Sequence, residues 1–249
     1  MMVNVEIDLE TSYEFIKEIY NNIVPEEFQQ VIKDLEQKEA FFQSFLIKDK
    51  LLKLSKQELT QLTSKMFTTK RLSKRWEDDH YEKFQSYTYE LLYGSDSFED
   101  RFEKFCSYVK KNLKMKKAYE VASEMLSFNE PDKYHLWSSF MWNPETDTGS
   151  LSLVFNDKDF LQNVPTLVEL YEIVGQAQEK LKESSKELGI EVTGTANKFD
   201  VPVFLGAVYT IYLFTVTRVR MTNEFTTILP TRLELLKRLF GIYKREMPQ

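Results

Sequence analysis

Apolar side chains recur every three or four residues through most of this 249-residue chain, and the residues that interrupt such a pattern are scarce. Gly and Pro number seven each, which is well below their average usage of roughly 7% and 5%. Because Gly and Pro make most tight turns, their scarcity favours long helices over many short strands. The sequence therefore predicts a mainly α fold, a multi-helix globular bundle.

Several local signals predict where these helices begin and end. Pro25 stands where a first-turn proline belongs, Ser55 and Glu58 form a capping box, and Ser97 is a second cap. Gly94 is a predicted helix stop. The predicted helices cover residues 11–23, 25–35, 41–54, 55–66, 72–93, 98–113, 118–128, 165–189, 201–217 and 231–240.

The length fits one large helical domain, residues 1–249, and it also fits a division into helical parts 1–94 and 95–249. Two segments alternate weakly between apolar and polar residues. They are 150–155 and 190–192, and together they could form a small two-stranded β-ribbon on the helical body.

Charge and cysteine content indicate a soluble protein of the cytoplasm. The formal net charge is −6, and the single cysteine, Cys106, can form no intramolecular disulfide. We expect no signal peptide at the N-terminus. Residues 201–217 carry no charge, but the run is short for a membrane span and contains Pro202 and three threonines, so a buried core helix is expected and membrane association is not.

Signatures of common enzymes are missing from the sequence. It has no Gly-rich phosphate loop, no CxxC, no HExxH and no GxSxG motif, and it contains only two histidines. We therefore expect no cofactor, no metal and no catalytic residue that could be named. A dispersed site that pairs His135 with Asp132 or Glu145 is the enzymatic alternative.

The segment from Phe128 to Phe155 differs in composition from the rest of the chain. Its rings carry polar edges and lie on a turn rich in proline, which suits recognition of a partner. In the alternative interpretation, the tryptophans fill the core and the histidine bonds a backbone carbonyl. The candidate binding residues here are Tyr134, His135, Trp137, Trp142 and Asn143.

Two groups of basic residues could bind phosphate, although lysines at a helix end more often complement the helix dipole. Contact with nucleic acid would require the lysines to lie beside aromatic rings. The first group is Lys70, Arg71, Lys74 and Arg75; the second is Lys110, Lys111, Lys114, Lys116 and Lys117. Lys114, Lys116 and Lys117 complete the set of candidate binding residues.

The dozen residues LSFNEPDKYHLW, from Leu126 to Trp137, resemble an element of small helical domains encoded by bacterial phage-defence and restriction-like operons. In that element a helix leads into a turn with proline, an aromatic residue and tryptophan. The resemblance implies a helical module that binds nucleic acid or a partner, and it implies no catalytic residue.

The function expected from the sequence is a non-catalytic binding or adaptor protein that uses the aromatic turn from Tyr134 to Trp142, with a role in phage defence. Its partner would be another protein or a second copy of the chain. The alternatives are a nucleic-acid-binding helical protein with a lysine-rich edge and an enzyme with a dispersed carboxylate and histidine site.

Overall fold

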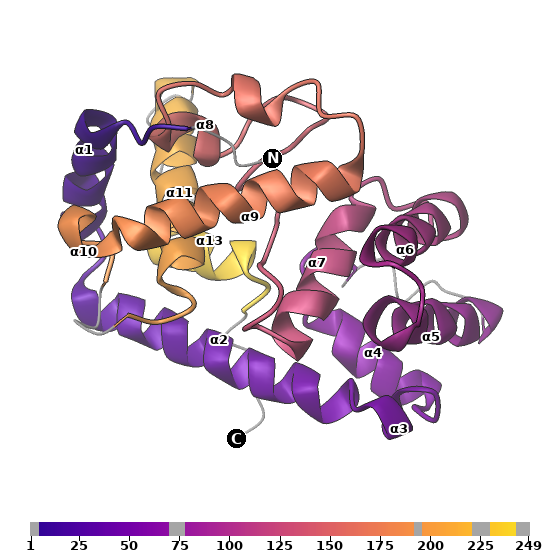
Figure 1. The fold of residues 1–249 in the computed structure, drawn as a ribbon. Helices are drawn as coiled ribbons and strands as arrows, with labels where there is room; N and C mark the ends of the chain where they lie inside the picture. The colour runs from indigo at the N-terminus through magenta and orange to yellow at the C-terminus, as the bar shows by residue number, and fades with distance from the viewer. Residues whose placement is uncertain (1–4, 70–77, 192–195, 221–229, 243–249) are drawn as a thin grey trace. The chain divides into compact units, whose positions relative to one another are not determined.

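A computed structural model describes residues 5–69, 78–191, 196–220 and 230–242. Within these residues the chain forms twelve α-helices and one short 3-10 helix, which confirms the mainly α fold (Figure 1). Nine of the α-helices have eight or more residues. The basic group at 70–75 lies outside the described residues.

The chain groups into two compact units, and each is built from separate segments. Unit 1 comprises residues 1–35, 139–164 and 173–249, and unit 2 comprises residues 36–138 and 165–172. The helices α2 (Pro25–Phe45) and α9 (Leu167–Glu183) each contribute residues to both units. Whether the chain forms one domain or two stays a prediction.

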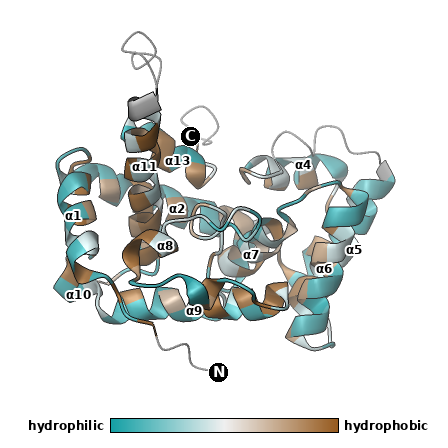
Figure 2. Cartoon of the chain, turned by 90° about the horizontal axis from the view of Figure 1, so that it is seen from above, coloured by the Kyte–Doolittle hydropathy of each residue, from teal (hydrophilic) through white to brown (hydrophobic). Residues whose placement is uncertain are grey.

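Unit 1 is arranged around α11, which contacts α1 and α13; α8 and α10 also contact α1. Figure 2 shows that α11 is apolar along nearly its whole length, whereas teal and brown alternate along α9. The helices of unit 1 are α1 (Leu9–Tyr20), α8 (Leu151–Val154), α10 (Ser185–Leu188), α11 (Asp200–Arg220) and α13 (Arg232–Leu239), with the 3-10 helix η2 at Asp159–Leu161.

Unit 2 is a helical assembly in which α5, α6 and α7 contact one another and α3 and α4 contact α5. Phe84 of α5 meets Phe105 of α6 inside it, with 5.9 Å between the ring centroids. The helices of unit 2 are α3 (Lys48–Leu51), α4 (Lys56–Ser64), α5 (Asp78–Tyr93), α6 (Phe98–Asn112) and α7 (Ala118–Asn129).

Several predicted helix starts agree with the structure, but the division into helices 25–35 and 41–54 is wrong, because α2 runs without a break from Pro25 to Phe45 and α3 covers only Lys48–Leu51. Pro25 opens α2, and the Ser55 and Glu58 capping box precedes α4. Ser97 caps α6, and a second capping box at Thr231 precedes α13. The first helix starts two residues before the predicted residue 11, because Asp8 is its N-cap and accepts the hydrogen bond from the Thr11 N–H at 2.9 Å, so that α1 begins at Leu9.

The predicted β-ribbon is wrong at its first segment. Residues Leu151–Val154 form α8, a single helical turn, and only Phe155 pairs in an extended manner, through an isolated antiparallel bridge to Ile7. No strand occurs among the described residues, and the second segment lies partly outside them. Leu151 and Val154 are both fully buried, and three residues apart on a helix they share one face, so the same alternation fits a buried turn.

The uncharged run forms most of α11. Among the described residues, the window Asp200–Thr217 is the one candidate that is long and apolar enough to cross a membrane. Within the structure 61% of this window is buried, as in the core helix of a soluble protein.

The central helix of unit 2 is α7, in which every residue from Ala118 to Phe128 is buried. One face of α7 is nevertheless polar, because Glu120, Ser123, Glu124 and Ser127 are three or four residues apart. Polar side chains in such a position need partners inside the protein.

Candidate interaction site

The aromatic turn lies inside the protein. Trp137 and Trp142 have no exposed surface, and Tyr134 is 8% exposed. The expectation that these rings present their polar edges to a partner is therefore wrong for the two indoles. The alternative interpretation, that the tryptophans fill the core, is confirmed.

His135 and Tyr171 hold the turn against the beginning of α9 within unit 2. The Nε2–H of His135 donates to the carbonyl of Tyr171 at 2.6 Å, and the Tyr171 hydroxyl donates to the carbonyl of His135 at 3.0 Å. The two rings also stack, with centroids 3.9 Å apart. Desolvation lowers the pKa of His135 to about 4, so the ring is neutral near pH 7.

No described carboxylate lies within hydrogen-bonding distance of His135, so the structure does not pair it with Asp132. Glu145 belongs to unit 1, whereas His135 belongs to unit 2. The histidine that the sequence offered to an enzymatic site instead makes a backbone contact, as the alternative interpretation predicted.

The polar face of α7 explains why the turn is directed inward. The hydroxyl of Ser123 accepts the Trp137 N–H and donates to the carbonyl of His135. The Trp137 indole stacks on Tyr119, with ring centroids 4.1 Å apart. Residues 135–137 therefore run along α7, and the Ser123 hydroxyl of that helix forms hydrogen bonds with the backbone groups of His135 and Trp137.

Trp142 and Asn143 belong to unit 1, where Asn143 closes a turn. The Asn143 N–H donates to the Thr148 carbonyl at 2.7 Å, and its side-chain oxygen accepts the N–H of Glu145 at 3.1 Å. Gly149 follows with φ 153°, and a Cβ there would lie 2.2 Å from the carbonyl oxygen of Met141. Asn143 therefore acts as a turn residue in this segment.

The second lysine group is exposed at the turn between α6 and α7 of unit 2. Leu113 and Met115 are buried there, so the side chains that alternate with them face solvent. Lys114 and Lys116 are exposed, and Lys117 is half-buried. A binding role for these three lysines stays a prediction.

The buried carboxylates of α7 have partners in unit 2. Glu124 forms an ion pair with Lys38, whose ammonium also lies 4.9 Å from the centroid of the Phe128 ring. Glu120 accepts hydrogen bonds from Thr68 and Ser138. Desolvation raises the pKa of Glu124 despite the lysine beside it.

Cys106 is buried, and desolvation raises the pKa of its thiol, which makes it a poor nucleophile. Among the described residues, no group of three or more His, Cys, Asp and Glu side chains could hold a metal ion.

The strongest candidate for contact with a partner is an exposed apolar face on α1 in unit 1, which sequence reasoning missed. Leu9 is 50% exposed, Tyr13 48% and Tyr20 38%; Val24, just beyond the helix, is 50% exposed. The spacing 9, 13, 16, 20 places three of these side chains on one helix face together with Ile16. We call Leu9, Tyr13, Ile16 and Tyr20 the α1 face.

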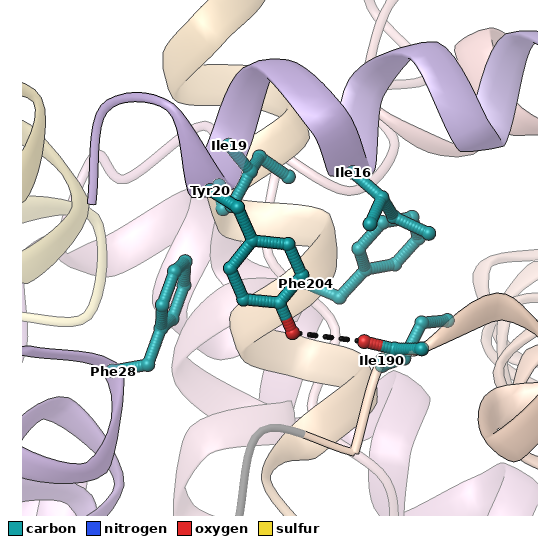
Figure 3. Close-up of a pocket in the computed structure, with 8 residues that line it drawn as sticks. Ile16, Ile19, Tyr20, Phe28, Ile190 and Phe204 are labelled. Atoms are coloured by element: carbon teal, nitrogen blue, oxygen red, sulfur yellow. Dashed lines mark hydrogen bonds between the residues drawn. The ribbon is translucent and has the colours of Figure 1, made fainter. Parts of the chain in front are cut away.

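An apolar hollow lies at one end of the α1 face (Figure 3). Its volume of about 20 Å³ is close to the room that one water molecule needs. The Tyr20 hydroxyl donates to the carbonyl of Gly189 at 2.9 Å across it, and Tyr13 makes a similar bond to Glu187 at 3.2 Å. The hollow is lined by Ile16, Ile19, Tyr20, Phe28, Gly189, Ile190, Phe204 and Ala207.

Exposed acidic residues occur on the other sides of α1: at 3.6 residues per turn Glu10 lies about a quarter turn from the α1 face, whereas Glu14 and Glu18 lie toward the opposite side. Glu10, Glu14 and Glu18 are exposed and follow one another at four-residue spacing along α1, where Lys17 is the one cation. Asp200 is 3% exposed, and it lies one turn before Phe204 on α11. Its burial raises the pKa of its own carboxyl, and its charge adds to the desolvation that raises the pKa of Tyr20.

A scan of protein-family models and searches of curated proteins and of solved structures found no match to this chain.

Proposed function

We propose that the protein is a non-catalytic binding module, an adaptor, that takes a basic amphipathic helix of a partner protein on the α1 face of unit 1. The observation that carries this proposal is an exposed apolar helix face that ends at an apolar hollow, on a helix that carries three exposed glutamates. Helix-in-groove recognition uses apolar anchors at such spacing.

The partner's charge follows from the charge of α1. Three exposed glutamates against one lysine give this helix a net negative charge, so lysines and arginines flanking an apolar stripe would complement it. Such a helix would place one apolar side chain over the hollow beside Tyr20.

The size of the α1 face favours a helix over a second copy of the chain. The three exposed side chains of this face, Leu9, Tyr13 and Tyr20, are 38–50% exposed and present roughly 250 Å² of surface, whereas a stable dimer buries about 800 Å² on each partner. A single docked helix needs no more than this face supplies, and its binding would be weak and reversible.

We also propose that the protein acts in the cytoplasm, which fits a single buried thiol. The resemblance of Leu126–Trp137 to domains of phage-defence operons supports a role in defence, and that role stays a prediction.

A designed peptide tests the docking proposal directly. The probe is a fluorescein-labelled helical peptide with leucines at positions i, i+3, i+4 and i+7 and lysines elsewhere, and binding is followed by fluorescence anisotropy. We expect a Kd of tens of micromolar, and at least tenfold weaker binding to the Leu9→Ser, Tyr13→Ser double variant. Phe67→Ser, at a residue of unit 2 that is 57% exposed, is the matched control and should bind normally.

Charge reversal supplies the second arm of the test. Glu10→Lys with Glu14→Lys should weaken binding of the lysine peptide and strengthen binding of the same peptide carrying glutamates. Equal binding of both peptides to the unaltered protein would overturn the proposal. So would a concentration-dependent dimer, seen by sedimentation, that the double serine variant abolishes, because a second copy would then occupy the α1 face.

A further inference from the structure

The lysine turn between α6 and α7 is a concentrated basic surface on an acidic protein. We define it as Lys110, Lys111, Lys114, Lys116 and Lys117. No aspartate or glutamate occurs from residue 104 to residue 119, although the whole chain carries a net charge of −6. No described carboxylate forms an ion pair with the first four of these lysines, all of which are exposed.

Carboxylates near this end of unit 2 are already engaged. Desolvation raises the pKa of the Tyr108 phenol, and the nearby charge of Asp79 raises it further. Asp79 is itself paired with Lys83, whose ammonium lies 3.1 Å from the carboxylate. Glu120, near the start of α7, accepts hydrogen bonds from Thr68 and Ser138. The lysine turn therefore faces solvent with its charge uncompensated by these groups.

The backbone of the lysine turn has an unfavourable dihedral angle at Lys114. Lys114 has φ 55°, in the left-handed region that Gly and Asn occupy at lower cost. A lysine in that conformation directs its side chain outward between the buried Leu113 and Met115. A strained residue that keeps a long cationic side chain points to a use for that charge.

An exposed aromatic platform is formed at α6, the helix that leads into the lysine turn. Tyr87 of α5 stacks on Tyr108 of α6 with ring centroids 4.2 Å apart and planes 6° apart, and Tyr87 remains 37% exposed. The Tyr108 hydroxyl is fixed by a 3.1 Å bond to the carbonyl of His80. Lys111 is one helical turn beyond Tyr108 on the same face of α6, so the first cations of the lysine turn follow the stacked pair along this helix.

We propose that the lysine turn and Tyr87 bind single-stranded nucleic acid, with the lysines on the phosphates and a base extending the tyrosine stack. Proteins that bind single strands combine a basic track with rings on which bases stack. This surface belongs to unit 2 and does not depend on docking at the α1 face of unit 1.

The test measures anisotropy of labelled dT12 and rU12 at several salt concentrations. If four lysines each neutralise one phosphate, binding should weaken about 50-fold between 50 mM and 200 mM salt. The variant in which Lys110, Lys111, Lys114 and Lys116 are all changed to Gln should lose most of the affinity and of the salt dependence. A control with the same net charge, in which Lys158, Lys180, Lys182 and Lys186 become Gln, should retain both.

Tyr87 separates base recognition from simple attraction between charges. Tyr87→Ala should weaken dT12 binding about tenfold and leave binding of inorganic polyphosphate unchanged, while Tyr87→Phe should bind dT12 normally. Absence of dT12 binding at 50 mM salt would overturn the proposal. Polyphosphate or polyglutamate that binds as tightly as dT12 would overturn it as well, since the surface would then select charge and not nucleic acid. Preference between dT12 and rU12 identifies which of the two strands is bound.

Discussion

Acidification from pH 7 to pH 4 should destabilise the protein through the His135 side chain. The unfolded chain binds a proton on this ring near pH 6.5, whereas the folded protein does so only near pH 4. Between these values the unfolded state holds more protons, so its population rises as the pH falls. Roughly two and a half pH units at ~1.4 kcal/mol per unit correspond to a loss of about 3 kcal/mol.

Urea denaturation at pH 7, 6, 5 and 4 measures this loss when the unaltered protein is compared with His135→Gln. Other groups titrate in the same range; Glu124, whose pKa is raised, contributes in the opposite direction. Their effects cancel in the difference between the two proteins. The difference in unfolding free energy should fall by about 3 kcal/mol from pH 7 to pH 4, and a constant difference would refute a desolvated, neutral imidazole. His80→Gln controls for loss of a histidine elsewhere.

Three further predictions concern buried groups. Lys38→Met should lower the free energy of unfolding by about 3–5 kcal/mol because it leaves the buried Glu124 carboxylate without its cation. Urea denaturation should show most of this loss recovered when Glu124→Leu is added. An unchanged stability of the single variant would contradict this. Gly149→Ala should lower stability by about 2 kcal/mol or more because its Cβ would collide with the Met141 carbonyl; an unchanged thermal midpoint would show that the backbone can move. Cys106 should react with a thiol reagent only as fast as the protein unfolds, since it is buried and its thiol pKa is raised; rapid labelling of the native protein would oppose that account.

The helices could be predicted because their signals are local. Pro25, Ser55 and Ser97 act through hydrogen bonds or fixed dihedral angles within one helical turn, so the fold around them matters little. The segment 151–154 could not be assigned in this way, because a four-residue apolar run has the same alternation in a strand and in a buried helical turn.

Exposure of the aromatic turn could not be predicted because it depends on distant partners. A tryptophan and a histidine with polar edges look the same in a recognition surface and in a core. The inward placement of Trp137 and His135 follows from Ser123 on α7 and Tyr171 on α9, whose side chains form hydrogen bonds with the backbone of these two residues. No local pattern in residues 134–142 identifies these partners.

The α1 face left a signal that sequence reasoning passed over. The inward residue Ile19 belongs to one stripe of α1, whereas Leu9, Tyr13 and Tyr20 belong to another. A 12-residue helix that is apolar on two faces has more apolar surface than a single core contact covers. Two apolar stripes on so short a helix therefore indicate that α1 has a second contact surface.

The polar face of α7 has a consequence for how uniquely unit 2 packs. Glu120, Ser123 and Glu124 find their partners at one position of the helix along its axis, and a shift of one turn would leave two carboxylates stranded away from water. Replacing the polar residues of this face by leucines should therefore favour collapse and permit several slid arrangements, which broadened amide resonances would reveal. The buried polar groups at the centre of unit 2 thus fix the axial position of α7, which apolar contacts alone would leave undetermined.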